Sequence, residues 1–239
     1  ATGSAIRGRG AAANPPNRFE PLSYIHDPDD TGGFEEPGDA RPETQFFTET
    51  SRSIITRNDS PDIPFDASLN PYRGCEHGCV YCYARPSHEF LGWSAGVDFE
   101  SRILIKTDAP ELLDRTLSRP SWEPQTIALS GNTDCYQPIE KRLELTRRCL
   151  AVFLDHRNPV GIITKSFLVT RDLDLLSELA HHQLLAVTLS VTTLSVDLAT
   201  RMEPQASEPG GRLKAIEQLA AAGIPVGVTI TSQLELSFG

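Results

Sequence analysis

The spacing of hydrophobic residues changes near residue 63 of this 239-residue chain. Before that point Gly, Pro, Asp and Glu dominate, and the apolar residues keep no sustained period. After it, short aliphatic runs typical of strands alternate with stretches whose apolar residues lie three and four apart, as they do in helices. The pattern predicts a flexible acidic N-terminal arm over residues 1–62 and a folded core over residues 63–230. Within the arm, only the apolar pairs at 46–47 and 54–55 could dock, so a strap around the core is the alternative to a flexible tail.

The core reads as about six strand–helix steps. Strands are predicted just before residue 75 and at 103–106, 126–130, 160–164, 184–191 and 225–230. Helices are predicted at 110–117, 139–156, 172–182 and 212–222. Such alternation calls for a parallel sheet with right-handed crossovers. The expected fold class is therefore α/β, a partial (β/α)6 barrel, with an open doubly wound sheet as the alternative. In both architectures the chemistry lies at the C-terminal ends of the strands.

Composition narrows the class of protein. The hydrophobic content of 39% and charged content of 23% are those of an ordinary globular protein. The sequence has no apolar run long enough to span a bilayer and no signal-peptide pattern, so we expect a cytoplasmic protein without a membrane partner. The net charge of -10 argues against non-specific binding to the nucleic-acid backbone. Five cysteines, three of them within eight residues, indicate metal binding rather than a disulfide framework.

The decisive stretch is a loop with the spacing C-x3-C-x2-C, formed by Cys75, Cys79 and Cys82. Three thiolates at this spacing can wrap a short loop around three corners of a [4Fe–4S] cube, which leaves the fourth iron open to a small molecule. Gly74 and Gly78 allow tight turns beside the metal and would leave amide N–H groups free to point at sulfur.

Two other interpretations use the same cysteines. A structural zinc ion would take His77 or His88 as its fourth ligand, or the thiols would be unliganded core residues. Zinc ligands normally come as two C-x2-C pairs, whereas the remaining Cys135 and Cys149 are isolated in the sequence. The spacing therefore favours the iron–sulfur cluster.

A cysteine loop with an aromatic residue before its last cysteine, placed after the first strand of a six-step partial barrel, resembles the radical SAM superfamily over residues 64–230. The resemblance implies that the open iron chelates S-adenosylmethionine. One electron, from a donor such as flavodoxin or ferredoxin, then breaks a C–S bond and gives a 5′-deoxyadenosyl radical that abstracts hydrogen. It also implies that Tyr81 packs beside the adenine.

Further cofactor-binding residues are expected at the ends of the next strands. The segment Ser130, Gly131, Asn132, Thr133 and Asp134 matches the place where the family holds the cofactor's amino group; Gly131 permits close approach, and Asp134 can accept from an ammonium. Lys165 ends the following strand, where it can meet the cofactor's carboxylate. Ser190 ends the strand after that. Taken alone, the five-residue segment is a generic turn, and Lys165 and Ser190 could be polar strand caps.

Within the superfamily the chain resembles the spore photoproduct lyase-like subgroup and its uncharacterised bacterial relatives. The resemblance rests on residues 82–83, 133–138, 191–193 and 202–204, and arm residues 7–11 and 17–20 resemble the uncharacterised relatives specifically. It implies two catalytic residues, Tyr83 at the subgroup's tyrosine position and Cys135 as a radical quencher, and nucleic acid as a substrate class. Cys135 lies just after the acidic turn, whereas the lyase's cysteine lies just before it, so dimer repair does not carry over directly.

The expected function is that of a radical SAM enzyme with an unidentified substrate. The alternative is a non-catalytic iron–sulfur or zinc-binding interaction protein. Residues 231–239 form an atypical tail where the family continues with a further helix, so the chain is expected to be truncated at its C-terminus and to expose apolar residues of its last strand.

Overall fold

The computed structural model describes residues 8–19, 43–57 and 65–230. Its main sheet has the strand order β2-β3-β6-β7-β8-β9. Strands β3 and β6 to β9 run parallel, and β2 pairs antiparallel with β3 at one edge. The strands are β2 (Ile55–Arg57), β3 (Ala67–Leu69), β6 (Ile127–Leu129), β7 (Val160–Thr164), β8 (Leu185–Ser190) and β9 (Val226–Thr229). The α/β class with a mainly parallel sheet that the alternation predicts is confirmed.

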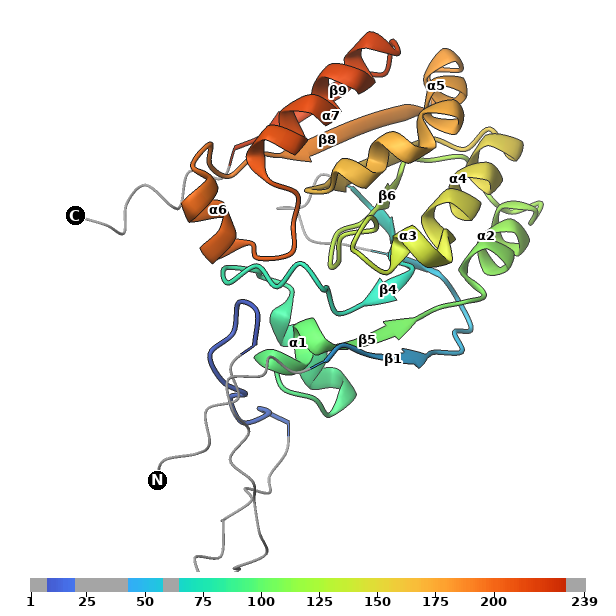
Figure 1. Cartoon of the computed structure of the whole chain (residues 1–239). Coiled ribbons are helices and arrows are strands. Elements are labelled where there is room, and N and C mark those ends of the chain that lie inside the picture. The colour runs from blue at the N-terminus through green and yellow to red at the C-terminus, as the bar shows by residue number, and fades with distance from the viewer. Residues whose placement is uncertain (1–7, 20–42, 58–64, 231–239) are drawn as a thin grey trace, which may run out of the picture.

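Helices pack along one face of this sheet (Figure 1). The long ones are α2 (Ala109–Leu117), α4 (Leu145–Asp155), α5 (Leu173–His181) and α7 (Pro209–Ala221). Their apolar faces and the aliphatic strands form one large buried core, because each apolar stripe must be removed from water against another element. The end of β7 comes to the cysteine loop, since the Lys165 ammonium lies 5.7 Å from the centre of the Tyr81 ring, and the segment after β6 meets the loop where Asp134 faces His77.

The second strand that the sequence predicts belongs to another sheet. It forms as β5 (Arg102–Ile105), but it lies between β1 (Gln45–Thr48) and β4 (Tyr72–Arg73) in a three-stranded sheet of order β1-β5-β4. In the main sheet β3 instead pairs directly with β6. Pairing is non-local, so the hydrophobic pattern of a short strand does not specify its partner.

The description of residues 1–62 as a flexible arm is wrong for the parts that the structure describes. The structure instead shows the docking that the sequence leaves open for both apolar pairs. Phe46 and Phe47 lie in β1 and pair with β5, while Ile55 in β2 pairs with Leu69 and Ile54 is buried. Residues 8–19 also lie against the core. Backbone pairing and glycine contacts hold these pieces, and neither leaves a periodic apolar pattern.

The single helix expected over 139–156 is divided into α3 (Glu140–Leu143) and α4. Glu144 separates the two with a positive φ of 52°. The buried carboxylate of Glu140 accepts a bond from the Thr146 amide at 3.1 Å, so it caps the start of α4 in place of a backbone carbonyl. A local side-chain contact therefore interrupts a pattern that reads as continuous.

Short helical elements connect the rest of the chain. They are η1 (Arg85–Leu91), α1 (Val97–Ser101), η2 (Phe167–Asp172) and α6 (Val196–Met202). Strand β9 forms the other edge of the main sheet, where Val228 and Ile230 are 49% and 75% exposed. Within the described ranges, no helix has the length and apolar character needed to cross a membrane.

Candidate metal centre

The three cysteines lie in one loop between β4 and η1. The two glycines that the sequence singles out make its turns, because Gly74 and Gly78 have φ values of 79° and 65°. A Cβ on Gly74 would lie 2.8 Å from the Phe99 carbonyl oxygen, so the loop also needs glycine for space. The expected free amide at Gly78 is wrong, since that amide donates to the Cys75 carbonyl at 3.3 Å.

The cysteine side chains form a sheltered group of thiols. All five cysteines of the chain are free; Cys75 and Cys79 are buried and Cys82 is half-buried. Burial raises the pKa of Cys79 and of Cys82, and the nearby Cys75 raises both further. A thiol in such surroundings stays protonated unless a cation binds it, and soft thiolate ligands suit iron–sulfur clusters. The loop therefore fits a cluster that is held by three thiolates.

The geometry does not converge on one ion. Among the described residues, no group of three or more His, Cys, Asp or Glu is placed to hold a single metal ion. The two histidines offered as zinc ligands have other partners. His77 Nδ1 lies 3.4 Å from an Asp134 oxygen, and His88 Nε2 lies 2.9 Å from the Arg102 carbonyl. In a cubane each thiolate binds a different iron, so its ligands need not meet at one point.

The segment after α6 holds the cysteine loop from its other side. The Val80 amide donates to the Met202 carbonyl at 3.0 Å, and the Gln205 amide donates to the His77 carbonyl at 3.2 Å. The Tyr81 hydroxyl donates to the Glu203 carboxylate. Residues far apart in sequence therefore fix the part of the loop that carries Cys79 and Cys82.

Lys165 comes to this same place from the end of β7. Its ammonium lies 3.9 Å from the Glu203 carboxylate and 5.7 Å from the centre of the Tyr81 ring. Burial opposes the charged form of Glu203, but Arg212 and the Tyr81 hydroxyl lower its pKa, so it is an anion at neutral pH. A cation, an aromatic face and a carboxylate thus lie together beside the cysteines.

Arg212, in α7, is a residue of this centre that the sequence does not single out. Its side chain is fully buried, and it bonds Glu203 at 2.5 Å and the Ser190 carbonyl at 3.1 Å. Ser190 lies at the end of β8 as predicted, and its carbonyl is its link to this network. Nothing in the sequence separates Arg212 from an ordinary surface arginine, because its partners come from three other segments.

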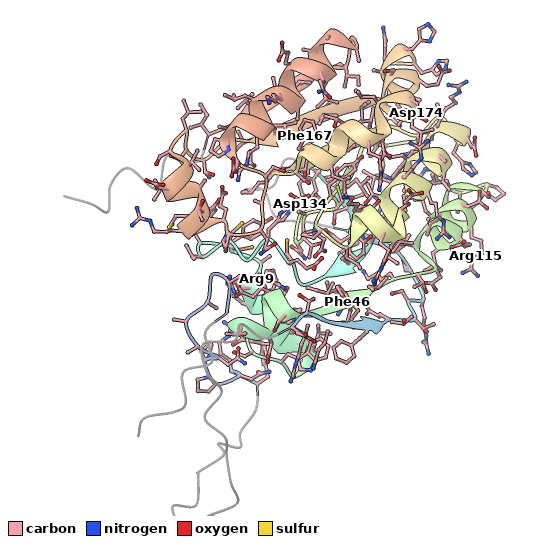
Figure 2. The ribbon with its side chains drawn as sticks, viewed as in Figure 1. Arg9, Phe46, Arg115, Asp134, Phe167 and Asp174 are labelled. Atoms are coloured by element: carbon pink, nitrogen blue, oxygen red, sulfur yellow. The ribbon has the colours of Figure 1, made fainter. Side chains whose placement is uncertain are left out.

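Asp134 sits near the middle of the fold, between the cysteine loop and β7 (Figure 2). Its carboxylate accepts from the Thr164 hydroxyl at 2.7 Å, the Lys165 amide at 2.8 Å and the Tyr136 amide at 2.9 Å, and it faces His77. Burial opposes ionisation, but the charge and hydrogen bond of His77 hold the pKa of Asp134 at about 2. These four partners use the acceptor positions of the carboxylate. Asp134 therefore fixes its surroundings, and the expected contact with an ammonium is not supported.

The rest of the segment after β6 is also tied internally. The Ser130 hydroxyl donates to the Thr133 carbonyl, and the Thr133 hydroxyl donates to the Tyr72 carbonyl. The backbone amide of Asn132 donates to the Asn70 side-chain oxygen, and Asn132 itself is exposed. Gly131 has a φ of 122°, and a Cβ there would lie in ordinary van der Waals contact, 3.7 Å from Phe65 and 3.8 Å from Ser68. Binding of a cofactor by these four residues stays a prediction.

The structure separates the two residues expected to be catalytic. Tyr83 is 76% exposed, and its hydroxyl donates to the Gly131 carbonyl across the site. Cys135 is completely buried in the large core, with its thiol 3.7 Å from the Leu129 carbonyl. A radical quencher must reach its substrate, so this burial contradicts the expectation for Cys135. Its small apolar side chain fills core space instead.

Comparisons with known proteins agree with this arrangement. The family model described as the radical SAM superfamily matches residues 69–234. An uncharacterised protein of Mycobacterium tuberculosis is 37% identical over 172 residues, which cover 72% of this chain and 51% of that protein. An uncharacterised protein of Methanocaldococcus jannaschii is 31% identical over 156 residues, covering 65% and 56%. The chain therefore spans about half the length of the curated relatives it matches.

Solved structures with a similar fold include two of spore photoproduct lyase. The complex with dinucleoside spore photoproduct has a TM-score of 0.56 at 18% identity, over 78% of this chain and 51% of that one. A mutant with bound AdoMet and dinucleoside spore photoproduct has a TM-score of 0.55 at 18% identity, over 77% and 50%. At these identities the likeness concerns the fold.

Proposed function

Since the chain belongs to the radical SAM superfamily, we propose that Cys75, Cys79 and Cys82 hold its [4Fe–4S] cluster and that the protein cleaves S-adenosylmethionine to start radical chemistry. When bound, the cluster supplies one electron to the sulfonium, whose C–S bond breaks to give methionine and a 5′-deoxyadenosyl radical. A small electron-transfer protein such as flavodoxin or ferredoxin delivers that electron. The radical then abstracts hydrogen from the substrate.

The observation that carries this proposal is the meeting of Lys165, Tyr81 and Glu203 beside the buried cysteine loop. The Lys165 ammonium is suited to the carboxylate of S-adenosylmethionine, because a lysine acts as a point charge with three donors. The buried, ionised Glu203 holds the Tyr81 hydroxyl and the Lys165 ammonium in place for the ligand. The Tyr81 ring offers a flat apolar face to adenine.

The segment after β6 lies beside this site, since the Tyr83 hydroxyl reaches the Gly131 carbonyl. Gly131 carries no side chain, so its backbone can approach a ligand closely, and the exposed Asn132 beside it offers polar groups to a ligand. Asp134 acts indirectly, because it bonds the backbone amide of Lys165 and so fixes the end of β7. Ser190 supports the site through Arg212.

Nucleic acid is the first substrate class to test. Spore photoproduct lyase, whose fold this chain shares, is known in complex with a dinucleoside photoproduct. The exposed Tyr83 beside Cys82 is placed to meet a substrate. A hydrogen relay through Cys135 is not part of the proposal, because that thiol is buried in the core.

Anaerobic reconstitution tests the proposal. The purified chain is loaded with iron and sulfide, reduced with dithionite in the presence of S-adenosylmethionine, and analysed for 5′-deoxyadenosine. A radical SAM enzyme gives a brown protein with four irons per cluster that releases 5′-deoxyadenosine, and the Cys79→Ala variant gives neither. A zinc-binding or non-catalytic iron–sulfur protein releases no 5′-deoxyadenosine, and that result would end the proposal.

A further inference from the structure

Residues 8–19 of the N-terminal arm run directly beside the cysteine loop. In Figure 1 this dark blue segment lies below the loop and to the left of α1, and Figure 2 marks Arg9 near the loop. The segment includes part of the glycine–arginine motif at 7–11, to which the proposed function assigns no role.

Gly10 and Gly78 fit against each other. A Cβ on Gly10 would lie 1.7 Å from the Gly78 carbonyl oxygen, a distance that no side chain can accept. A Cβ on Gly78 would in turn lie 3.0 Å from Arg9 and 3.2 Å from Glu100. Glycine on both sides lets the two backbones touch, and the Gly78 carbonyl is the one that precedes Cys79.

Glu100 joins the arm to the other side of Cys79. Its fully buried carboxylate accepts from the Gly10 amide at 3.0 Å and from the Ala11 amide at 3.4 Å. The same carboxylate bonds Arg85 at 2.7 Å. Arg85 donates from Nε and Nη2 to the Cys79 carbonyl, at 3.1 and 2.9 Å. Both carbonyls that flank the Cys79 Cα are therefore held by this assembly.

The following arm residues are anchored along α1 and the turn before it. Two hydrogen bonds join Asn14 and Asp98. The Asn14 side-chain amide donates to the Asp98 carboxylate at 3.0 Å, and the Asp98 backbone amide donates to the Asn14 side-chain oxygen at 3.1 Å. The Ser94 hydroxyl donates to the Pro15 carbonyl at 2.8 Å. A Cβ on Gly96 would lie 2.0 Å from the Ala13 carbonyl oxygen. The chain thus reaches the cysteine loop in one defined register.

We infer that the arm is a structural part of the cluster site, with Gly10 and Glu100 as positioning residues that set the direction of the Cys79 thiolate. The inference rests on the proposed function, because it requires a cluster on these cysteines. Gly10 fixes the carbonyl before Cys79, and Glu100 fixes the one after it through Arg85. Partners behind a ligand orient it, and losing one weakens metal binding.

Gly10→Ala tests the inference in the full chain. The new methyl group meets a backbone carbonyl, and the N-terminal segment can leave the core to relieve that contact. Gly210→Ala is the matched control, because Gly210 in α7 has open space around its Cβ position. Release of the arm is measured by trypsin cleavage after Arg9 and Arg18 in the protein without cluster. The reconstituted proteins are then compared by iron loss to a ferrous chelator and by the EPR spectrum of the reduced cluster, with and without S-adenosylmethionine.

We expect Gly10→Ala to expose Arg9 and Arg18 to trypsin, to lose iron about tenfold faster or more, and to change the EPR spectrum, while Gly210→Ala matches the unaltered protein. An arm that is released with no change in iron loss or spectrum overturns the inference, and so does an arm that stays docked in Gly10→Ala. If the unaltered protein binds no cluster, the proposed function itself fails and the inference falls with it.

Glu100→Gln is a second variant, and we expect the same changes from it. Its control is Glu111→Gln, on the exposed face of α2.

Discussion

The guanidinium of Arg212 lies 2.5 Å from the carboxylate of Glu203, and both side chains are inaccessible to solvent, at 0% and 1% exposure. Arg212 also reaches the end of β8 through the Ser190 carbonyl and the loop before α7 through the Ser207 carbonyl. The pair therefore joins three segments behind the residues proposed to bind S-adenosylmethionine.

Arg212→Met is expected to lower the free energy of unfolding by about 3–5 kcal/mol, because it leaves the Glu203 charge buried without its main partner. Urea unfolding of the protein without cluster, followed by circular dichroism, measures the change. Arg148→Ala is the control, since Arg148 pairs with Glu111 on the exposed surface and such pairs contribute about 0–1 kcal/mol. Equal losses in the two variants would contradict the importance of the buried pair.

Replacing any one of Cys75, Cys79 or Cys82 by Ala is expected to abolish stable cluster binding, because only two thiolates would then remain to bind the cluster. Cys135→Ala and Cys149→Ala should keep the iron content of the unaltered protein, since both thiols are buried in the large core away from the loop. Iron and sulfide analysis after anaerobic reconstitution measures the result. Iron at the normal level in Cys79→Ala would remove the cluster from this loop.

Local patterns in the sequence predict most elements of the fold but not their pairing. The four long helices form at the predicted places, because each carries its own apolar stripe. Strand β5 also forms where expected, yet it pairs with β1 from the arm, 57 residues earlier. The docking of residues 8–19 depends on Glu100, which is about ninety residues away. No local period records such contacts.

The same distinction holds for the candidate site. Cys75, Cys79 and Cys82 can be recognised because their spacing lies within one loop. The sequence also places Lys165 at the end of a strand, where the structure has it next to Glu203. It does not indicate Arg212, whose partners are distant in sequence. It suggests chemistry for Cys135, because burial cannot be read from one isolated cysteine.

Lys165→Ala is expected to weaken binding of S-adenosylmethionine while leaving the cluster in place. One hydrogen bond to a charged group contributes about 1.5–3 kcal/mol, which corresponds to a factor of roughly ten to a hundred in the dissociation constant. Anaerobic calorimetry on the reconstituted protein measures it. Lys214→Ala, at an exposed position of α7, is the control. An unchanged dissociation constant in Lys165→Ala would mean that this lysine caps the end of β7 and does not bind the ligand.

Asp134→Asn is expected to destabilise the protein without cluster in a pH-dependent way. Although burial opposes the charge, His77 and the surrounding donors hold the pKa of Asp134 at about 2, below the ordinary value of 3.8. A folded-state pKa below the unfolded one means that the carboxylate stabilises the fold above about pH 4 and that this contribution disappears as the pH falls towards 2. The difference in pKa corresponds to about 2 kcal/mol at neutral pH.

Urea unfolding of the unaltered protein and of Asp134→Asn between pH 5 and pH 3 measures this contribution, in a range where His77 is protonated in the folded and unfolded chains. The gap between the two unfolding free energies should be constant from pH 5 to about pH 4 and should narrow below it, because the unfolded chain then takes up a proton at Asp134 while the folded protein does so only near pH 2. Glu123→Gln, which removes an exposed carboxylate, should show no such gap. The variant should also bind S-adenosylmethionine more weakly, since the Lys165 amide loses a charged acceptor at 2.8 Å. A gap that stays constant down to pH 3 would show that the charge of Asp134 does not contribute, and that its shape and hydrogen bonds alone hold the end of β7.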